Sequence, residues 1–282
     1  FPYTTLFRSY QSARPLGVGS LMRHHGRVHA RDEVRGTPAP APPAAADTGG
    51  GLFPRTTSFR SRRSALSDAQ RATWERHWPR LGREVRAGAA DGRLAPLDAQ
   101  AWFGRRAPLV LEVGCGTGSA TLAMAQAEPD VDVLAVEVYR RGLAQLLSAI
   151  HRENVTNIRL IRGDAVEVLS DLLTDDSLAG VRVFFPDPWP KARHHKRRLL
   201  QPATVALITD RLAPGGVLHA ATDHLGYAEQ IAEAGDAEPR LRRVAAGARL
   251  PVSVTRPITK YETKAREAGR AVTELIWEKR RP

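Results

Sequence analysis

The sequence is poor in cysteine and in long apolar runs, and each shortage excludes something. Cys115 is the single cysteine among 282 residues, which excludes an internal disulfide and a cysteine-based metal cluster and is typical of a reducing cytosolic compartment. The apolar runs have the length of strands, far below the roughly 20 residues that span a bilayer. We therefore expect a cytoplasmic protein with no membrane segment and no metal.

Acidic residues are also in short supply relative to basic ones. Lys and Arg number 42 against 30 Asp and Glu, which gives a net charge of +12 and a pI near 10.7. This excess favours a polyanionic partner such as nucleic acid, although a generally basic protein would show it too. Composition leaves both a monomer and a homodimer open.

The first 55 residues contain little that could form a core. Residues 36–51 read GTPAPAPPAAADTGGG, and ordering such a segment would cost entropy without compensating contacts. We predict that residues 1–55 are a disordered tail, and we treat the part before Met22 as a candidate non-native segment.

A helix is predicted directly after this tail and a short basic arm. Ser67 and Gln70 have the spacing of a capping box, and Trp74 and Trp78 lie four residues apart on one helical face. We expect this helix to pack on the main domain, with its tryptophans used for packing rather than as a platform for bases.

From residue 108 onward, short apolar segments alternate with longer amphipathic ones. Such strands, apolar throughout and separated by helical patterns, indicate a parallel sheet covered on both faces. APGGVLHAATD (213–223) adds a strand after a Pro-Gly-Gly turn, and RAVTELIWEKR (270–280) has the alternation of a last strand. We predict one α/β, Rossmann-like domain over residues 56–282, whose doubly wound, mostly parallel sheet ends in an antiparallel late strand.

A glycine loop follows the first strand of this pattern. Gly114, Gly116 and Gly118 permit a sharp turn and a ligand close to the backbone, and Glu137 ends the next strand about twenty residues on, where an acid can accept ribose hydroxyls. A dinucleotide site needs G-x-G-x-x-G, but here the third glycine comes one residue early and Glu112 would repel a phosphate. The pattern therefore disfavours a nicotinamide enzyme and favours S-adenosylmethionine, which carries a sulfonium and an ammonium group.

A third acid follows the next strand. Asp164, in RGDA, is placed to accept a hydrogen bond from the adenine amino group. A competing interpretation is that Glu112, Glu137 and Asp164 merely cap helices. Three acids after three successive strands favour the cofactor site.

The segment FFPDPWPKARHHKRR (184–198) places an acid, an aromatic ring and five cations close together. Asp187 follows a strand on the side of the sheet where α/β proteins bind ligands, and Trp189 offers a flat face for a base. The run from residue 191 to 198 contains no acid, which suits contact with a phosphate backbone, although a solvated charge run is the alternative.

These motifs together resemble those of a known family. EVGCGTG, the acid after the second strand and GDA are similar to the motifs of class I methyltransferases that use S-adenosylmethionine. With the 184–198 segment, ATD (221–223) and TKYE (259–262), the sequence resembles the bacterial tRNA (guanine-N7-)-methyltransferases over about residues 56–282. The resemblance implies S-adenosylmethionine as cofactor, tRNA as partner, and methyl transfer to N7 of a guanosine in the variable loop.

The resemblance also implies roles for residues at matching positions. The sequence departs from the family pattern at His194 and His195, where the family often has a single histidine. Asp187 is implied to be the catalytic residue. The cofactor residues are Glu112, Gly114, Gly116, Gly118, Glu137, Asp164 and Asp187; the substrate residues are Lys191, Asp223, Thr259, Lys260, Tyr261 and Glu262; the RNA-contacting residues are Arg193, His194, His195, Lys196, Arg197 and Arg198.

Two other functions fit parts of the sequence. A methyltransferase acting on an exocyclic amino group of a base would also have a polar residue after the fourth strand, but an amide would suit it better than the carboxylate of Asp187. A catalytically silent RNA-binding module of the same fold would not need the three cofactor acids. We therefore expect the guanine-N7 reaction.

Overall fold

The computed structural model describes residues 65–87, 94–244, 248–258 and 260–282. The predicted tail and the basic arm after it lie outside these residues. Within them, no helix is long and apolar enough to cross a membrane, and no group of three His, Cys, Asp or Glu side chains is placed to hold a metal ion.

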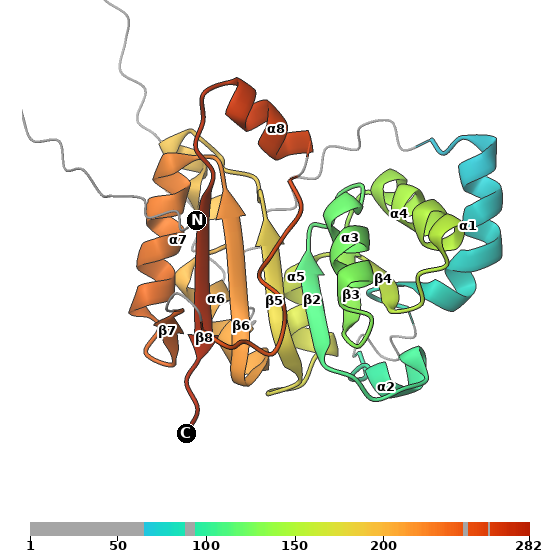
Figure 1. Cartoon of the computed structure of the whole chain (residues 1–282), viewed down its shortest axis with the longest axis horizontal. Coiled ribbons are helices and arrows are strands. Elements are labelled where there is room, and N and C mark those ends of the chain that lie inside the picture. Colours follow the sequence, from blue (N-terminus) through green and yellow to red (C-terminus); the bar gives the residue numbers. More distant parts are fainter. Residues whose placement is uncertain (1–64, 88–93, 245–247, 259) are drawn as a thin grey trace, which may run out of the picture. The chain divides into compact units, whose positions relative to one another are not determined.

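An eight-stranded sheet forms the centre of the domain, in the order β1-β4-β3-β2-β5-β6-β8-β7 (Figure 1). β1 to β6 pair in parallel, and β8 pairs antiparallel with both β6 and β7, so the predicted antiparallel late strand is confirmed. The strands are β1 (Gly82–Glu84), β2 (Leu109–Val113), β3 (Asp132–Glu137), β4 (Ile158–Arg162), β5 (Leu178–Phe184), β6 (Leu212–Thr222), β7 (Leu241–Arg243) and β8 (Thr273–Lys279).

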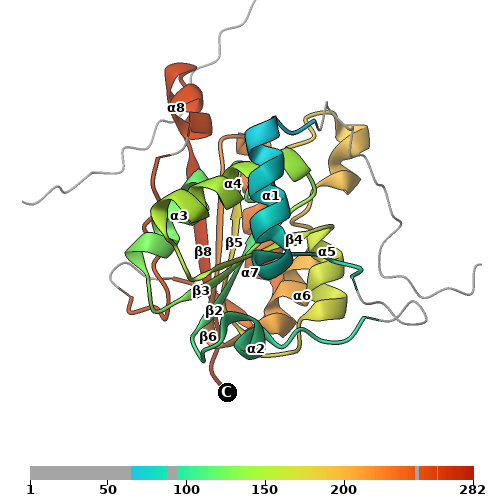
Figure 2. The same ribbon diagram turned by 90° about the vertical axis from the view of Figure 1, so that its right-hand side faces the viewer.

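Helices cover both faces of this sheet, as the apolar strands predict (Figures 1 and 2). α1 (Asp68–Leu81), α3 (Ser119–Ala127) and α4 (Arg140–Glu153) pack on one face of β3 and β4, around Val133 and Ile158. The opposite face packs against α5 (Ala165–Glu167), α6 (Pro202–Arg211) and α7 (Leu225–Ala237). The shorter helices are α2 (Ala99–Phe103), the π-helix η1 (Val168–Leu172), the 3-10 helix η2 (Ala192–Arg197) and α8 (Lys260–Glu267).

The structure confirms the predicted N-terminal helix in detail. The Gln70 N–H donates to Ser67 Oγ at 3.3 Å, and the Ser67 N–H donates to Gln70 Oε1 at 3.1 Å, which completes the capping box. The Trp74 and Trp78 rings stack with centroids 3.9 Å apart. Trp74 is buried in the cluster that joins α1 to α4, so the pair serves for packing.

β6 differs from its prediction at the Pro-Gly-Gly sequence. The expected turn lies inside the strand, which begins at Leu212. The pairing with β5 shifts there, from Leu178↔Leu212 to Gly180↔Val217, and Gly215 has φ 84°. Glycine permits this irregularity because its left-handed backbone angle would strain other residues.

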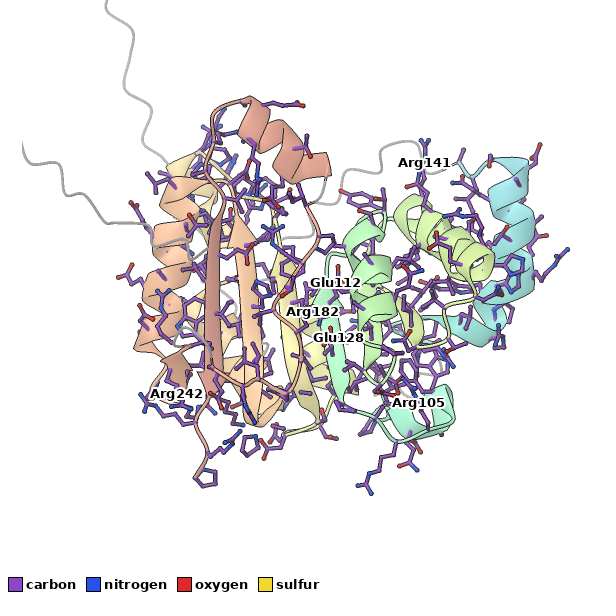
Figure 3. The ribbon with its side chains drawn as sticks, in the orientation of Figure 1. Arg105, Glu112, Glu128, Arg141, Arg182 and Arg242 are labelled. Carbon is purple, nitrogen blue, oxygen red and sulfur yellow. The ribbon has the colours of Figure 1, made fainter. Side chains whose placement is uncertain are left out.

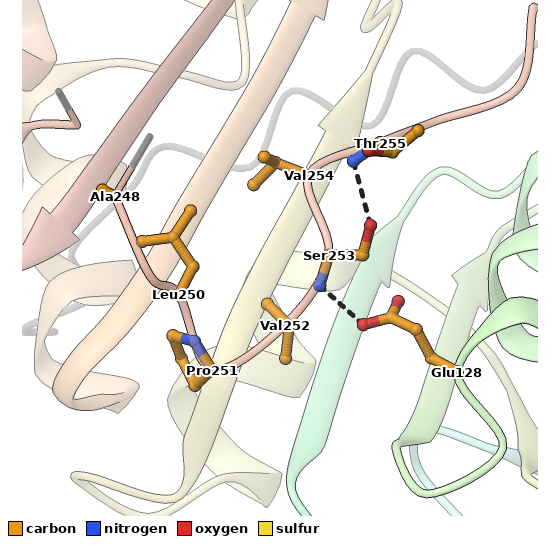
Figure 4. Close-up of a pocket in the computed structure, with 8 residues that line it drawn as sticks. All are labelled: Glu128, Ala248, Leu250, Pro251, Val252, Ser253, Val254 and Thr255. Carbon is orange, nitrogen blue, oxygen red and sulfur yellow. Dashed lines mark hydrogen bonds between the residues drawn. The ribbon is translucent and has the colours of Figure 1, made fainter. Parts of the chain in front are cut away.

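An extended segment, residues 248–258, lies over β2 and β6 on the sheet face opposite α6 and α7. Val252 packs there against Val110 of β2 and Val217 of β6. The Ser253 N–H donates to Glu128 Oε1 at 2.6 Å, which fixes the segment near the end of α3 (Figure 4). This 248–258 segment leads directly toward α8, so it connects the sheet face to one of the predicted substrate motifs.

Candidate active site

The strand order reverses between β2 and β5, and ligands of open α/β sheets bind beside such a switch point. The glycine loop after β2 lies there, with φ angles of 72° at Gly114, 57° at Gly116 and 76° at Gly118. A Cβ atom on Gly114 or Gly116 would lie more than 4 Å from the described residues other than its neighbours in the chain. The loop therefore leaves its backbone open at these two positions.

Gly142, on α4, packs against this loop and was not predicted from the sequence. A Cβ atom there would lie 2.2 Å from the backbone oxygen of Gly116. Because no side chain fits, α4 can pack directly on the glycine loop. A glycine early in an amphipathic helix is the sequence signal for such a close approach.

Glu137 ends β3 and is bonded to the glycine loop. Its Oε2 accepts the Gly116 N–H at 2.9 Å, and its Oε1 accepts the N–H groups of Val138 at 2.7 Å and Tyr139 at 3.0 Å. A carboxylate has about four acceptor positions. One acceptor position therefore remains, on Oε2. The sequence suggested that Glu137 could accept hydrogen bonds from both ribose hydroxyls, but one position can serve only one of them.

Asp164 follows β4 and has two roles available. Its Oδ1 accepts the Val166 N–H at 2.8 Å and caps α5. The helix-cap interpretation is thus correct for one oxygen, while the second makes no hydrogen bond to the described residues. The Gly163 N–H donates to the Glu137 backbone oxygen at 3.2 Å, which joins the ends of β3 and β4.

Glu112, on β2, is the most deeply buried of the predicted cofactor acids. Its side chain lies beside that of Arg182, its register partner on β5 (Figure 3). Burial raises the pKa of Glu112 to about 7, although the Thr121 hydroxyl and the Arg182 guanidinium act to lower it. Among the residues that the structure describes, its buried Oε2 has no hydrogen-bond partner. A ligand cation would stabilise the charged form of this carboxyl group.

Cys115 lies within the glycine loop as a free thiol. Burial raises its pKa well above the ordinary value, and the nearby Glu112 and Glu137 carboxylates raise it further. The thiol therefore stays protonated at neutral pH and is a poor nucleophile.

The predicted catalytic residue, Asp187, lies in a loop directly after β5. It is exposed, and within the described part of the chain its carboxylate makes no hydrogen bond or ion pair. Phe185 and Trp189, on either side of it, have φ angles of 51° and 41°. Bulky residues rarely adopt this region, and such strain is common where a loop serves a function.

The basic segment after this loop includes the 3-10 helix η2. Lys191, Arg193 and Lys196 are exposed. Arg197 lies over the Trp189 ring at 5.2 Å, and His194 meets that ring edge-on at 5.8 Å. Burial and the surrounding cations lower the pKa of His194, so the lysines and arginines supply the positive charge. His195 is half-buried.

Arg198 differs from the other residues predicted to contact RNA. It is 4% exposed. Its guanidinium donates to the backbone oxygens of Pro188 at 2.8 Å and Gly226 at 3.1 Å and to Gln230 Oε1 at 2.7 Å. It also lies over the Tyr227 ring at 4.8 Å. We correct the prediction on this point: Arg198 holds the Asp187 loop on α7 and has no free face for phosphate.

The remaining predicted substrate residues lie around α8 and the end of β6. Asp223 pairs with Arg270 at 2.6 Å. Glu262 is 3% exposed and pairs with Arg256 and Arg266, each at 2.5 Å. Both acids are therefore already bound by arginine, in contrast to Asp187. Thr259 and the side chains of Lys260 and Tyr261 lie outside the described residues.

The sheet order, the glycine loop after β2 and the acid at the end of β3 define a Rossmann-like methyltransferase that uses S-adenosylmethionine. A family described as "Putative methyltransferase" matches residues 106–275. The chain is 63% identical over 260 residues to the tRNA (guanine-N(7)-)-methyltransferase of Mycobacterium avium, covering 92% of this chain and 100% of that protein. It is 66% identical over 269 residues to the enzyme of that name from Mycolicibacterium gilvum, covering 92% and 99%.

The chain belongs to the family of tRNA (guanine-N(7)-)-methyltransferases, which confirms the resemblance seen in the sequence. Among solved structures, the antibiotic-resistance methyltransferase Kmr aligns with a TM-score of 0.45 and 15% identity, over 66% of this chain and 92% of that one. At this level the likeness concerns the fold and does not bear on the substrate.

Proposed function

We propose that this protein transfers the methyl group of S-adenosylmethionine to N7 of a guanosine in the variable loop of tRNA, as a cytoplasmic enzyme. The observation that carries the proposal is the position of Asp187. It is an exposed carboxylate without a partner among the described residues, beside the switch point and directly before the cations of the 191–197 segment. This arrangement suits a planar base attached to a polyanion.

The residues after β2, β3 and β4 fit S-adenosylmethionine. Gly114 and Gly116 leave open space, Glu137 keeps one acceptor position on Oε2, and Glu112 has an oxygen without a partner. We assign Glu137 to the ribose, Asp164 to the adenine amino group and Glu112 to the cationic methionine end. When bound, the cofactor supplies a methyl group activated by its sulfonium.

The reaction needs no general base. The N7 lone pair of guanine attacks the methyl carbon, the N–C bond forms as the S–C bond breaks, and the electron pair of that bond stays on sulfur. Positive charge thereby arrives on the purine. Asp187 stabilises this charge and accepts a hydrogen bond from the N1 or N2 edge of the base, so its contribution is electrostatic and positional.

Phosphate contacts by Lys191, Arg193 and Lys196 would hold the tRNA while the base enters the site. These three side chains are exposed, and the sequence has no acidic residue between positions 191 and 198. Such contacts position a nucleic acid without reading its sequence. The choice of guanosine then rests on the residues around Asp187, Asp223 and α8.

One experiment tests the reaction itself. The protein is incubated with labelled S-adenosylmethionine and unmodified tRNA, and the product is treated with borohydride and aniline, which cleave RNA at 7-methylguanosine. We expect label in the tRNA and scission within the variable loop. Label without scission would indicate methylation of an amino group, and cofactor binding without label would indicate a silent RNA-binding module.

A further inference from the structure

A buried arginine joins the two segments that the proposed reaction must bring together. The Arg256 side chain is 3% exposed, although it lies in the extended 248–258 segment. Its Nη1 contacts Glu262 Oε2 of α8 at 2.5 Å, and its Nη2 contacts Glu274 Oε1 of β8 at 2.8 Å. One guanidinium thus binds two carboxylates from different elements, a geometry that an ammonium group does not reproduce.

The two carboxylates extend this contact into a network. Glu274 Oε2 lies 3.1 Å from Nε2 of His219 on β6, whose side chain is 2% exposed. The hydrogen bond from His219, together with the charge of Arg256, lowers the pKa of Glu274. Glu262 Oε1 also pairs with Arg266. The network therefore connects β6, β8, α8 and the 248–258 segment.

The same guanidinium reaches the loop that carries Asp187. It lies 5.8 Å from the ring centroid of Phe184, the last residue of β5, and 5.3 Å from that of Phe185. Phe185 has φ 51°, and its N–H donates to the Ala221 oxygen of β6 at 2.7 Å. A bulky residue holds such a backbone angle only when its surroundings fix it. Asp187 follows two residues later.

We propose that Arg256 is a positioning residue for methyl transfer, an inference that rests on the proposed function. It holds the Asp187 loop through Phe184 and Phe185, and it holds α8 through Glu262. Because the distance between the catalytic carboxylate and the bound base depends on both contacts, Arg256 sets the reacting geometry without touching the base or the cofactor.

The test compares Arg256→Met and Arg256→Lys with the parent protein. The assay measures the single-turnover rate of 7-methylguanosine formation at saturating tRNA and S-adenosylmethionine. The rate is divided by the concentration of cofactor-binding sites, and each variant is assayed well below its unfolding temperature. Since a misplacement of about 1 Å can reduce a rate ~100-fold, we expect Arg256→Met to be slower by ~10-fold or more. Arg256→Lys should recover only part of the rate. Cofactor affinity should change by less than ~3-fold because Glu112, Glu137 and Asp164, which we assign to the cofactor, lie at β2, β3 and β4, away from the contacts of Arg256.

Arg242→Met is the matched control. The Arg242 side chain pairs with the buried Glu278 of β8 at 2.9 Å, and its strand, β7, pairs with β8 at the edge of the sheet. It should lower the unfolding temperature and leave the rate per site unchanged. If Arg256→Met fails to fold, Glu274→Gln removes the charge of one of the two carboxylates that Arg256 binds and should reduce the rate in the same direction.

Folded Arg256 and Glu274 variants that react at the parent rate would overturn the inference and leave Arg256 with a purely structural role. The same holds if the Arg242 variant loses as much rate per site as the Arg256 variant. A parent protein that forms no 7-methylguanosine would overturn the proposed function, and the inference with it, so the two failures are distinguishable.

Discussion

The proposed cofactor half of the site comprises the residues at the ends of β2, β3 and β4, and the proposed substrate half comprises the 191–198 segment, the end of β6 and α8. Different interactions hold the two halves. At the ends of β3 and β4, the acids are fixed by nearby backbone: Glu137 accepts three N–H groups and Asp164 accepts one. After β6 and on α8, the acids are fixed by arginines, as in the pairs of Asp223 with Arg270 and of Glu262 with Arg256. Asp187, between the two halves, has no such partner among the described residues.

This difference has a physical meaning. Backbone hydrogen bonds form with the strand-to-helix turn itself, so the cofactor half is preorganised as soon as the sheet forms. Arginine pairs join separate elements, as Asp223 after β6 is joined to Arg270 before β8, and they hold only while those elements pack correctly. We therefore expect changes in the cofactor half to affect cofactor affinity and changes in the substrate half to affect the rate of transfer.

The largest effect is expected for Asp187→Ala. If the carboxylate stabilises charge arriving on the purine, the single-turnover rate at saturating tRNA and cofactor should fall by ~10²-fold or more, the scale found for loss of one preorganised electrostatic group. Binding of tRNA, measured separately, should persist because the exposed cations are unchanged. Saturation with both ligands matters, since incomplete cofactor occupancy would imitate slower chemistry. A near-parent rate would remove Asp187 from the mechanism.

Glu137→Gln should affect the other half. The amide keeps the size of the side chain, but its NH₂ group would face one of the N–H donors that now bind the carboxylate, and the charge is removed. We expect cofactor affinity to fall by about 1–3 kcal/mol, measured by calorimetry. Glu153→Gln is the matched control, because Glu153 pairs with the exposed Arg152 on the last turn of α4. Equal affinity in the two variants would separate Glu137 from the cofactor.

The same contrast explains what the sequence could predict. The glycine loop, Glu137 and Asp164 follow strands that a simple alternation of patterns locates, so both their positions and their neighbours can be inferred from nearby residues. The capping box of α1 is equally local, and both of its hydrogen bonds are present. The fold class was thus within reach of sequence reasoning, and so were the positions of the glycine loop, Glu137 and Asp164 at the strand ends.

The substrate half was less accessible because its interactions join residues distant in the chain. Arg198 was grouped with the exposed cations next to it, but Gly226 and Gln230, 28 and 32 residues away, enclose its guanidinium. The two phenylalanines that Arg256 contacts lie more than 70 residues before it in the sequence. A charged residue in a local pattern does not reveal whether a distant element will cover it.

A smaller effect is expected for Glu112, as a dependence of cofactor affinity on pH. Its pKa is raised to about 7 in the protein, and a cationic ligand would favour the carboxylate. Binding should therefore release a proton, and affinity should rise by about tenfold as pH increases through this pKa. S-adenosylhomocysteine is the suitable probe for calorimetry because its ammonium stays protonated over this range.

Glu112→Gln is the control for this pH dependence, and its affinity should be nearly constant over the range. The free energy of unfolding gives a second reading. Because folding raises the pKa of Glu112 above its ordinary 4.5, the parent should lose stability relative to the Gln variant as pH rises from 4.5 to about 7. Parallel pH curves for the two proteins would contradict the assignment.

The smallest expected effect concerns the exposed cations of the substrate half. Replacing Arg193 and Lys196 by Ala should reduce the slope of log affinity against log salt for tRNA by roughly 0.7–0.9 for each phosphate that the protein no longer neutralises. Affinity at one salt concentration should fall only several-fold, and cofactor affinity should stay unchanged. Arg198→Ala serves as the contrast within the same segment: since its guanidinium is bound inside the protein, it should lower the unfolding temperature without changing the slope. A parent slope in the Arg193 and Lys196 variant would mean that this segment is a solvated surface, and a changed slope in the Arg198 variant would mean that the Asp187 loop opens when tRNA binds.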